Sequence, residues 1–211
     1  MPKIPASERD AFYEARRSEL ADIALKLWAE RGFDQTSVAA IARAAGIAKG
    51  TFYLYFESKD ALLLEVLRRN SLAPKVIELI RALQTASLEE AVHGFVQGAW
   101  RHLCEHRDLV LVALRELSPN LERARKAVEQ VVVPTNKAIA SFLESRIPPE
   151  RARKLSSVIA VRALIGMVIV VFLTQEVLGA GRLLPVPEAE ITKTIAELFL
   201  RGVAPDEVPS A

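Results

Sequence analysis

The 211-residue sequence predicts an all-α protein, with an N-terminal three-helix domain followed by a larger helical domain and about nine helices in total. Two observations lead to this prediction. Apolar residues recur every three to four positions, as on one face of a helix, and no stretch alternates apolar and polar residues as a half-buried strand would. Hydrophobic residues make up 51% of the chain and charged residues 26%, so a sizeable core and a charged surface are both available.

The first expected helices have recognisable starts and stops. Gly32 follows the first helix, as glycine often does after a helix C-terminus. Thr36 and Ser37 are good N-caps for a second, short helix that Gly46 ends, a third segment covers about residues 48–53, and Ser58 caps a fourth helix. The apolar face of the first helix comprises Leu20, Ile23, Ala24, Leu27 and Trp28.

Beyond Asn70 the expected helices are longer. Ser87 and Glu90 form a capping box that opens one of them. Pro134 falls inside another, where its missing N–H group leaves the carbonyl of Gln130 without a donor and predicts a kink. The expected ranges are 87–105, 108–117, 121–146, about 150–179 and 188–201.

These elements divide the chain into a domain at residues 1–60, a second domain at 61–204 and a tail at 205–211 that we expect to be disordered. The net charge of +2 is small, so nucleic-acid binding would depend on where the positive side chains lie. The N-terminus has no apolar signal segment, and Cys104 is the single cysteine, which fits a cytoplasmic protein. The apolar stretch Val158–Leu173 is shorter than the roughly 20 residues that cross a bilayer, so we expect a buried helix and no membrane partner.

Residues 36–53 predict a helix-turn-helix. Gly46 permits the left-handed backbone that a sharp turn between two short helices requires. The second of these helices could then project its outer residues into a DNA major groove. A small apolar core would hold the two helices together, formed by Leu27, Val38, Ile41, Ala42, Ala45, Ile47 and Phe52.

The stretch GIAKGTFYLYFESKDAL at residues 46–62 resembles the signature of the TetR family of transcriptional regulators, and the resemblance covers about residues 20–67. Ala48 departs from it, because the family often has a hydroxyl residue there as the cap of the recognition helix. The missing cap would cost about 1 kcal/mol. The resemblance implies base contacts by Lys49, Thr51 and Tyr53, close approach at Gly50, and phosphate contacts by Thr36, Ser37, Arg43, Tyr55 and Lys59.

A DNA reader with one short helix works best as a dimer that binds a near-palindromic operator. The apolar helix before residue 179 and the last helix are the expected interface, as in the TetR family, although an internal core would show the same pattern. Arg162 within it would pair with a carboxylate, across the dimer or otherwise. The expected interface residues are Arg162, Gly166, Val170, Ile191, Ile195, Leu198 and Phe199.

The middle helices carry the apolar residues that would surround a small lipophilic effector, whether fatty acyl, drug-like or aromatic. Ordinary core packing would explain each of them equally well. The expected effector residues are Val92, Phe95, Val96, Ala99, Trp100, Leu103, Leu114, Val131 and Phe142.

His102, Cys104 and His106 suggest a metal site, but Cys104 points away from the face that the two histidines share and a closed zinc site needs four ligands. We therefore expect no metal and no cofactor. No nucleophile elbow, Walker loop or dinucleotide-binding motif is present, so we expect no enzyme. The sequence favours a repressor that a small, largely apolar effector releases from its operator. The alternatives are a helical interaction protein that does not bind DNA and an enzyme that binds a small molecule.

Overall fold

The computed structural model describes residues 6–117, 119–146 and 156–203. Every element in these ranges is helical, which confirms the predicted all-α class. The chain forms two compact units, each built from two segments of the sequence. Unit 1 comprises the residues up to Ser71 together with Asp108–Gln130, and unit 2 comprises Leu72–Arg107 together with the residues from Val131 onward. The predicted boundary between residues 60 and 61, which divides the helix-turn-helix domain from the second domain, stays a prediction. The predicted tail at residues 205–211 lies outside the described residues.

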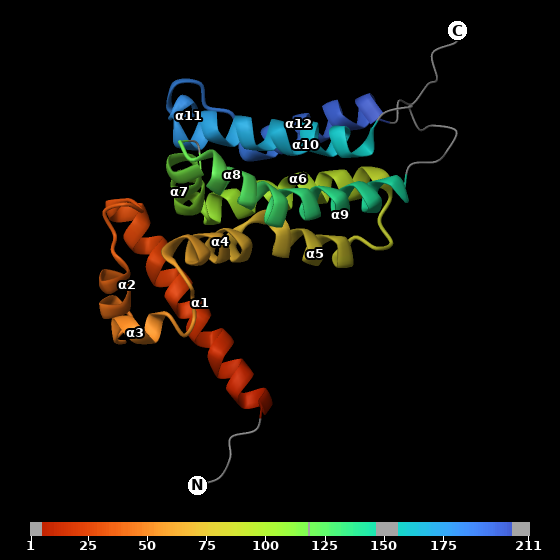
Figure 1. The fold of residues 1–211 in the computed structure, drawn as a ribbon. Coiled ribbons are helices and arrows are strands. Elements are labelled where there is room, and N and C mark those ends of the chain that lie inside the picture. The colour runs from red at the N-terminus through yellow and green to blue at the C-terminus, as the bar shows by residue number, and fades with distance from the viewer. Residues whose placement is uncertain (1–5, 118, 147–155, 204–211) are drawn as a thin grey trace, which may run out of the picture. The chain divides into compact units, whose positions relative to one another are not determined.

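Unit 1 contains the N-terminal helices and a later segment of the chain. Trp28, Phe33 and Phe52 form the centre of its core, and α4 and α8 pack together. Its helices, seen in Figure 1, are α1 (Ala6–Arg31), α2 (Val38–Ala44), α3 (Lys49–Phe52), α4 (Lys59–Asn70), α7 (Arg107–Leu117) and α8 (Leu121–Ala127).

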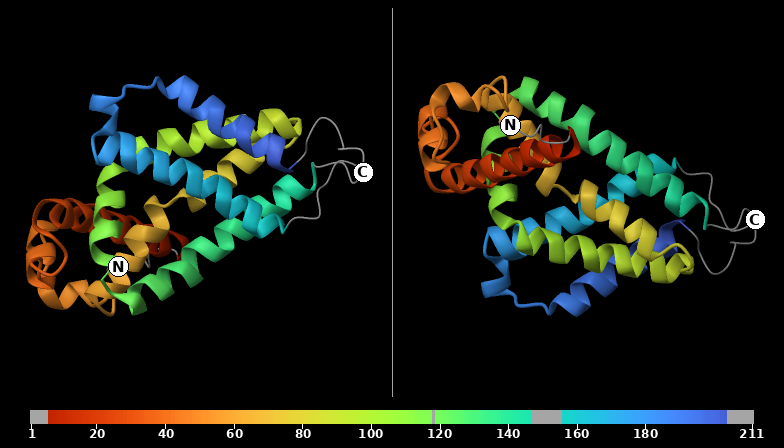
Figure 2. Two further views of the ribbon diagram at one scale, coloured as in Figure 1. Left: turned by 90° about the horizontal axis from the view of Figure 1, so that it is seen from above. Right: turned by 90° about the horizontal axis from the view of Figure 1, so that it is seen from below.

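Unit 2 is a bundle in three layers (Figures 1 and 2). The helix α5 packs on α6 and α9, and these two pack in turn on α10, while α12 packs on α6 and α10. Ser87 and Glu90 form the predicted capping box at the start of α6. The helices are α5 (Leu72–Ala82), α6 (Leu88–Glu105), α9 (Val133–Glu144), α10 (Ser157–Phe172), α11 (Ala180–Leu183) and α12 (Glu188–Val203).

The kink predicted at Pro134 takes the form of a π-helical turn, η1 (Val128–Val132), between α8 and α9. Pro134 cannot donate a backbone hydrogen bond, so the helix cannot continue through it with a regular ladder. Directly after Pro134, the hydroxyl of Thr135 donates to the carbonyl of Val131 over 2.6 Å inside unit 2. A second π-turn, η2 (Leu173–Val177), extends α10.

Candidate nucleic-acid interface

The helix-turn-helix is built from local signals. The Ser37 hydroxyl caps α2 by accepting from the N–H of Ala40 over 3.1 Å. Gly46 has a φ of 68°, the left-handed backbone that the turn requires. Ile41 and Phe52 are fully buried, so the predicted small core exists and fixes α2 against α3.

The helix α3 turns its polar residues outward. Lys49 and Gly50 are exposed and Tyr53 is 48% exposed, whereas Phe52 is buried and Thr51 is half-buried. Among the described residues, no atom lies within 4 Å of the point where a Cβ on Gly50 would be, so none of them blocks a close approach there. Ala48 supplies no side-chain cap to α3, as the sequence predicts.

Thr36 and Lys59 point into unit 1 instead of outward. Thr36 is 1% exposed, and its hydroxyl donates to the carbonyl of Gly32 over 2.7 Å. The Lys59 ammonium donates to the carbonyls of Phe33 over 2.8 Å and of Thr36 over 3.1 Å. The structure therefore moves Thr36 and Lys59 from the predicted phosphate contacts to the interior of the domain, where they hold the turn between α1 and α2.

Two cations lie close to the Phe33 ring. Lys59 Nζ lies 4.1 Å and the Arg123 guanidinium 4.3 Å from the ring centroid. Burial lowers the pKa of Lys59, and the charge on Arg123 lowers it further. Arg123 also binds the carboxylate of Asp60 and lies 3.8 Å from that of Glu116, so this cluster connects α8 to the turn before α2 and to the start of α4.

A second cluster connects α1 to the loop that follows α3. Tyr13 donates from its hydroxyl to the carbonyl of Leu54 over 3.0 Å, and its ring stacks on Tyr55 with centroids 5.1 Å apart. Arg17 donates to the carbonyl of Tyr55 over 2.5 Å. The half-buried ring of Tyr55 thus has a packing role in addition to the predicted phosphate contact, which stays a prediction.

Glu65 on α4 is 7% exposed and is surrounded by arginines. Its carboxylate lies 2.7 Å from Arg68, 3.5 Å from Arg17 and 3.8 Å from Arg69. The hydrogen bond from Arg68 holds the pKa of Glu65 below its ordinary value, and the charges on the arginines act in the same direction against the effect of burial. Sequence reasoning did not single out Glu65 or Arg123. The spacing of Arg68 and Arg69 at i+3 and i+4 from Glu65 was a local signal that could have found it. No local pattern marks the pairing of Arg123 with Asp60.

Glu65→Gln is expected to destabilise the protein by about 2 kcal/mol at neutral pH, since charged hydrogen bonds are lost. A carboxylate with a lowered pKa stabilises the fold above its unfolded-state pKa, and this contribution disappears as the pH falls through the folded-state value. The stability of the wild type should therefore approach that of the variant below about pH 4. Urea denaturation from pH 3 to pH 8 measures this, with Glu57→Gln on an exposed carboxylate as the control. A constant difference across that range would contradict the assignment.

The predicted effector residues divide into three groups. Phe95 and Phe142 line a small apolar cavity of about 10 Å³ in unit 2. Leu114 lies in unit 1 and is 46% exposed, and its predicted role stays a prediction. The other lining residues of the cavity are Leu79, Ile80, Leu83, Ile139 and Leu143. The predicted residues that are buried in unit 2 without lining this cavity are Val92, Val96, Ala99, Trp100, Leu103 and Val131.

The predicted dimer residues also separate. Arg162, Val170 and Leu198 are exposed on α10 and α12, and Gly166 is half-buried. Within unit 2, the core contains Ile191, Ile195 and Phe199. The structure therefore moves these three from the predicted dimer interface to the core of their own protomer. Ser157–Val177 is long and apolar enough to cross a membrane, a test that the core helix of a soluble protein also passes. Only 22% of its most apolar window is buried within the protomer, so the structure does not show the buried helix that the sequence predicts there.

Comparison with known proteins places the helix-turn-helix in a family. Residues 20–66 match the model of the bacterial regulatory proteins of the tetR family. An uncharacterized HTH-type transcriptional regulator of Bacillus subtilis, YuxN, is 34% identical over 53% of this chain and 39% of its own length. The fatty acid metabolism regulator protein of the same organism is 31% identical over 53% of this chain and 58% of its own length. The chain therefore aligns with less than two thirds of each of these relatives.

Solved structures share the fold over most of the chain. FadR from Bacillus subtilis, in complex with stearoyl-CoA, superposes with a TM-score of 0.71 at 20% identity and covers 88% of this chain and 98% of its own. FadR from Thermus thermophilus, in complex with lauroyl-CoA, gives a TM-score of 0.63 at 24% identity, with 92% and 98% covered. The local signature and its capped and glycine-terminated helices agree with this match: over residues 20–66 the chain is similar to the bacterial regulatory proteins of the tetR family, and the solved structures share its helical fold.

Proposed function

We propose that this chain is a transcriptional repressor that binds a near-palindromic operator and that a small, largely apolar effector releases from DNA. The observation that carries the proposal is the outward face of α3, where Lys49, Gly50 and Tyr53 are exposed above a buried Phe52. A short helix held in this way fits a major groove. Ser37 and Arg43, both exposed at α2, would contact phosphates, and Thr51 and Tyr55 would complete the surface at its edges.

The repressor would act as a homodimer. Much of the apolar helix α10 stays uncovered by its own protomer, and Val170 is 59% exposed there, as is Leu198 on α12. A two-fold copy of the same face would cover both residues, and Arg162 would pair with a carboxylate. Two recognition helices about 34 Å apart could then read successive major grooves on one side of the duplex. Because the partner copy would cover the apolar face of α10, the dimer favours a cytoplasmic protein that does not bind a membrane.

The effector would bind among α5, α6 and α9. The residues that line the cavity there are all apolar, which suits a hydrocarbon chain or another lipophilic group. The names of similar proteins support an acyl effector, since one regulates fatty acid metabolism and two similar structures hold acyl-CoA. Binding must enlarge the cavity of about 10 Å³, so the effector would favour a conformation different from the free one. Unequal affinity for the two conformations is what would couple it to DNA release.

The test is selection of duplexes from a random pool by the full chain, followed by titration of the selected DNA at rising salt. We expect inverted half-sites about one helical turn apart and an affinity that falls steeply with salt. Lauroyl-CoA and stearoyl-CoA should weaken this binding, whereas free CoA should not. A failure to enrich any sequence would refute the repressor and favour the alternative of a helical interaction protein. The other alternative is an enzyme that binds a small molecule. Such an enzyme would retain its catalytic activity in a variant in which Lys49 and Tyr53 are both replaced by alanine.

A further inference from the structure

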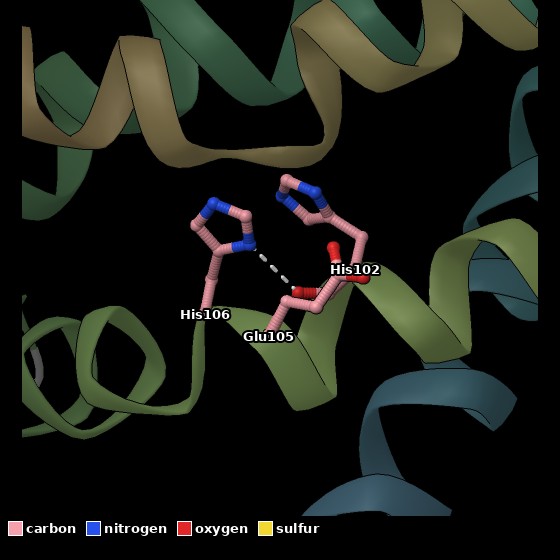
Figure 3. Close-up of side chains that lie close together, drawn as sticks. All are labelled: His102, Glu105 and His106. Atoms are coloured by element: carbon pink, nitrogen blue, oxygen red, sulfur yellow. Dashed lines mark hydrogen bonds between the residues drawn. The ribbon is translucent and has the colours of Figure 1, made fainter.

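Two clusters of polar side chains take no part in the proposed DNA-binding face. One lies at the end of α6, where the rings of His102 and His106 stack with centroids 4.0 Å apart and 24° between their planes (Figure 3). Nδ1 of His106 lies 2.9 Å from the carbonyl oxygen of His102. The nitrogens of two rings stacked in this way do not converge on one ion. The other cluster surrounds Arg123 in unit 1, and it connects segments that are far apart in the sequence.

Arg123 contacts both ends of the segment that contains the helix-turn-helix. The first end is Phe33, which precedes the cap of α2, and the guanidinium carbon of Arg123 lies 4.3 Å from the centroid of its ring. The second end is Asp60 in the first turn of α4, whose carboxylate accepts a hydrogen bond from Nε of Arg123 over 2.5 Å. All of these residues lie in unit 1. One side chain therefore ties the two ends of residues 34–59 to α8.

The neighbours of Arg123 keep its side chain in this position. The side chain is 21% exposed. Asn120 caps α8 by accepting from the backbone N–H of Arg123 over 3.0 Å, so Arg123 lies in the first turn of that helix. Glu116 on α7 is 6% exposed, and one of its carboxylate oxygens lies 3.8 Å from Arg123. Its other oxygen accepts from the backbone N–H of Phe33 over 3.4 Å, so α7 and α8 both hold the residue that precedes α2.

Fixing both ends of residues 34–59 would set the direction of α3. The helix α3 (Lys49–Phe52) has four residues, too few to hold an orientation by its own hydrogen bonds, and it packs on α2. A binding surface works only when its groups are held within about 0.5 Å of the productive geometry. Lys59 ties the two ends to each other through the carbonyls of Phe33 and Thr36, and Arg123 ties both of them to a helix outside the segment.

We propose that Arg123 is a positioning residue for DNA recognition, which orients the helix-turn-helix without touching DNA. It follows that α7 and α8 belong to the DNA-reading unit, whereas the predicted boundary after residue 60 assigns them to the second domain. Arginine suits this role because its planar fork donates to a carboxylate while its face lies against an aromatic ring, and lysine offers only a point charge. The inference rests on the proposed repressor function.

The first test compares Arg123→Met, which keeps most of the length of the side chain, with Arg125→Met, which removes the same charge from an exposed position on the same helix. Fluorescence anisotropy measures binding to the DNA that the wild type selects, from about 50 to 200 mM salt. Arg123→Met should bind at least about tenfold more weakly at every salt concentration, with the salt dependence of the wild type because no phosphate contact is lost. Arg125→Met should stay within about twofold of the wild type.

Arg123→Lys keeps the charge and loses the fork, so it should weaken binding by about threefold. It makes the same comparison if Arg123→Met does not fold. Hydrogen exchange measured by mass spectrometry tests the contacts without DNA. Residues 31–37 and 58–64 should exchange faster in Arg123→Met than in the wild type or Arg125→Met, while α12 in unit 2 should exchange as in the wild type.

Three results would overturn the proposal. Unchanged exchange would show that Arg123 does not hold the two ends, and faster exchange with unchanged DNA affinity would show that its role is only structural. A shallower salt dependence in Arg123→Met would show that Arg123 itself contacts a phosphate. A wild type that selects no DNA would refute the repressor, which is distinct from a wild type and an Arg123→Met variant that bind equally well.

Discussion

Replacing Lys49 and Tyr53 together by alanine is expected to weaken binding to the selected DNA by at least about 100-fold, or roughly 2.7 kcal/mol. Both side chains project from the α3 region, and neither makes a hydrogen bond or ion pair within the described part of the protein. The ring of Tyr53 packs edge-on against the buried Phe52 with centroids 5.4 Å apart, so the double variant loses this one aromatic contact in addition to the DNA contacts. Fluorescence anisotropy at a fixed salt concentration measures the affinity, and the salt dependence should become shallower because a phosphate or base contact by Lys49 is lost.

The matched control is Lys193→Ala, which removes an exposed positive charge from α12 in unit 2. It should bind DNA as the wild type does. The double variant should stay folded, with a melting temperature lowered by no more than about 5 °C, because it loses one partly exposed aromatic contact and no buried side chain. If the double variant bound DNA with unchanged affinity, α3 would not be the recognition helix and the proposed interface would be wrong.

Phe33→Ala is expected to lower the free energy of unfolding of unit 1 by about 3–5 kcal/mol. The ring is 1% exposed and contacts Trp28 at a centroid distance of 5.0 Å. The cations of Lys59 and Arg123 lie 4.1 and 4.3 Å from the centroid of the ring. Without the ring, the core has a cavity and two positive charges lose their aromatic partner. Chemical denaturation followed by circular dichroism measures the change.

Two further variants separate these causes. Phe12→Ala removes an exposed ring from α1 and should change stability by less than about 0.5 kcal/mol. Phe33→Leu fills most of the volume but has no π face, so its cost relative to wild type should be about 1–2 kcal/mol and should reflect the cation contacts. Equal effects of Phe33→Ala and Phe12→Ala would show that the cluster around Phe33 contributes nothing to stability.

The sequence alone located the helix-turn-helix, because the determinants of that motif act over four residues or fewer. Ser37 and Ser58 cap the helices that follow them, and Gly46 has the left-handed backbone that its position required. The residue type at Ala48 likewise predicted that α3 has no side-chain cap at its N-terminus. The same local logic predicted the interruption at Pro134, although not that a π-turn would result.

Only the tertiary structure decided which polar side chains are free to act. Threonine and lysine are residue types that often contact phosphates, but the side chains of Thr36 and Lys59 donate their hydrogen bonds to backbone carbonyls of the protein. These carbonyls belong to a turn whose path depends on the packing of unit 1. Arg123 reaches Asp60, 63 residues earlier in the chain, and no short sequence pattern encodes such a pairing.

Helical periodicity likewise identifies an apolar face without saying what covers it. Ile191 and Phe199 complete the core of their own protomer, whereas Leu198 on the same helix faces outward. Burial is a property of the assembled helices, since each face is covered only when a second helix from elsewhere in the chain, or from another chain, packs against it. The sequence therefore determined the helices and the reading surface, and the packing of those helices decided which residues remain on it.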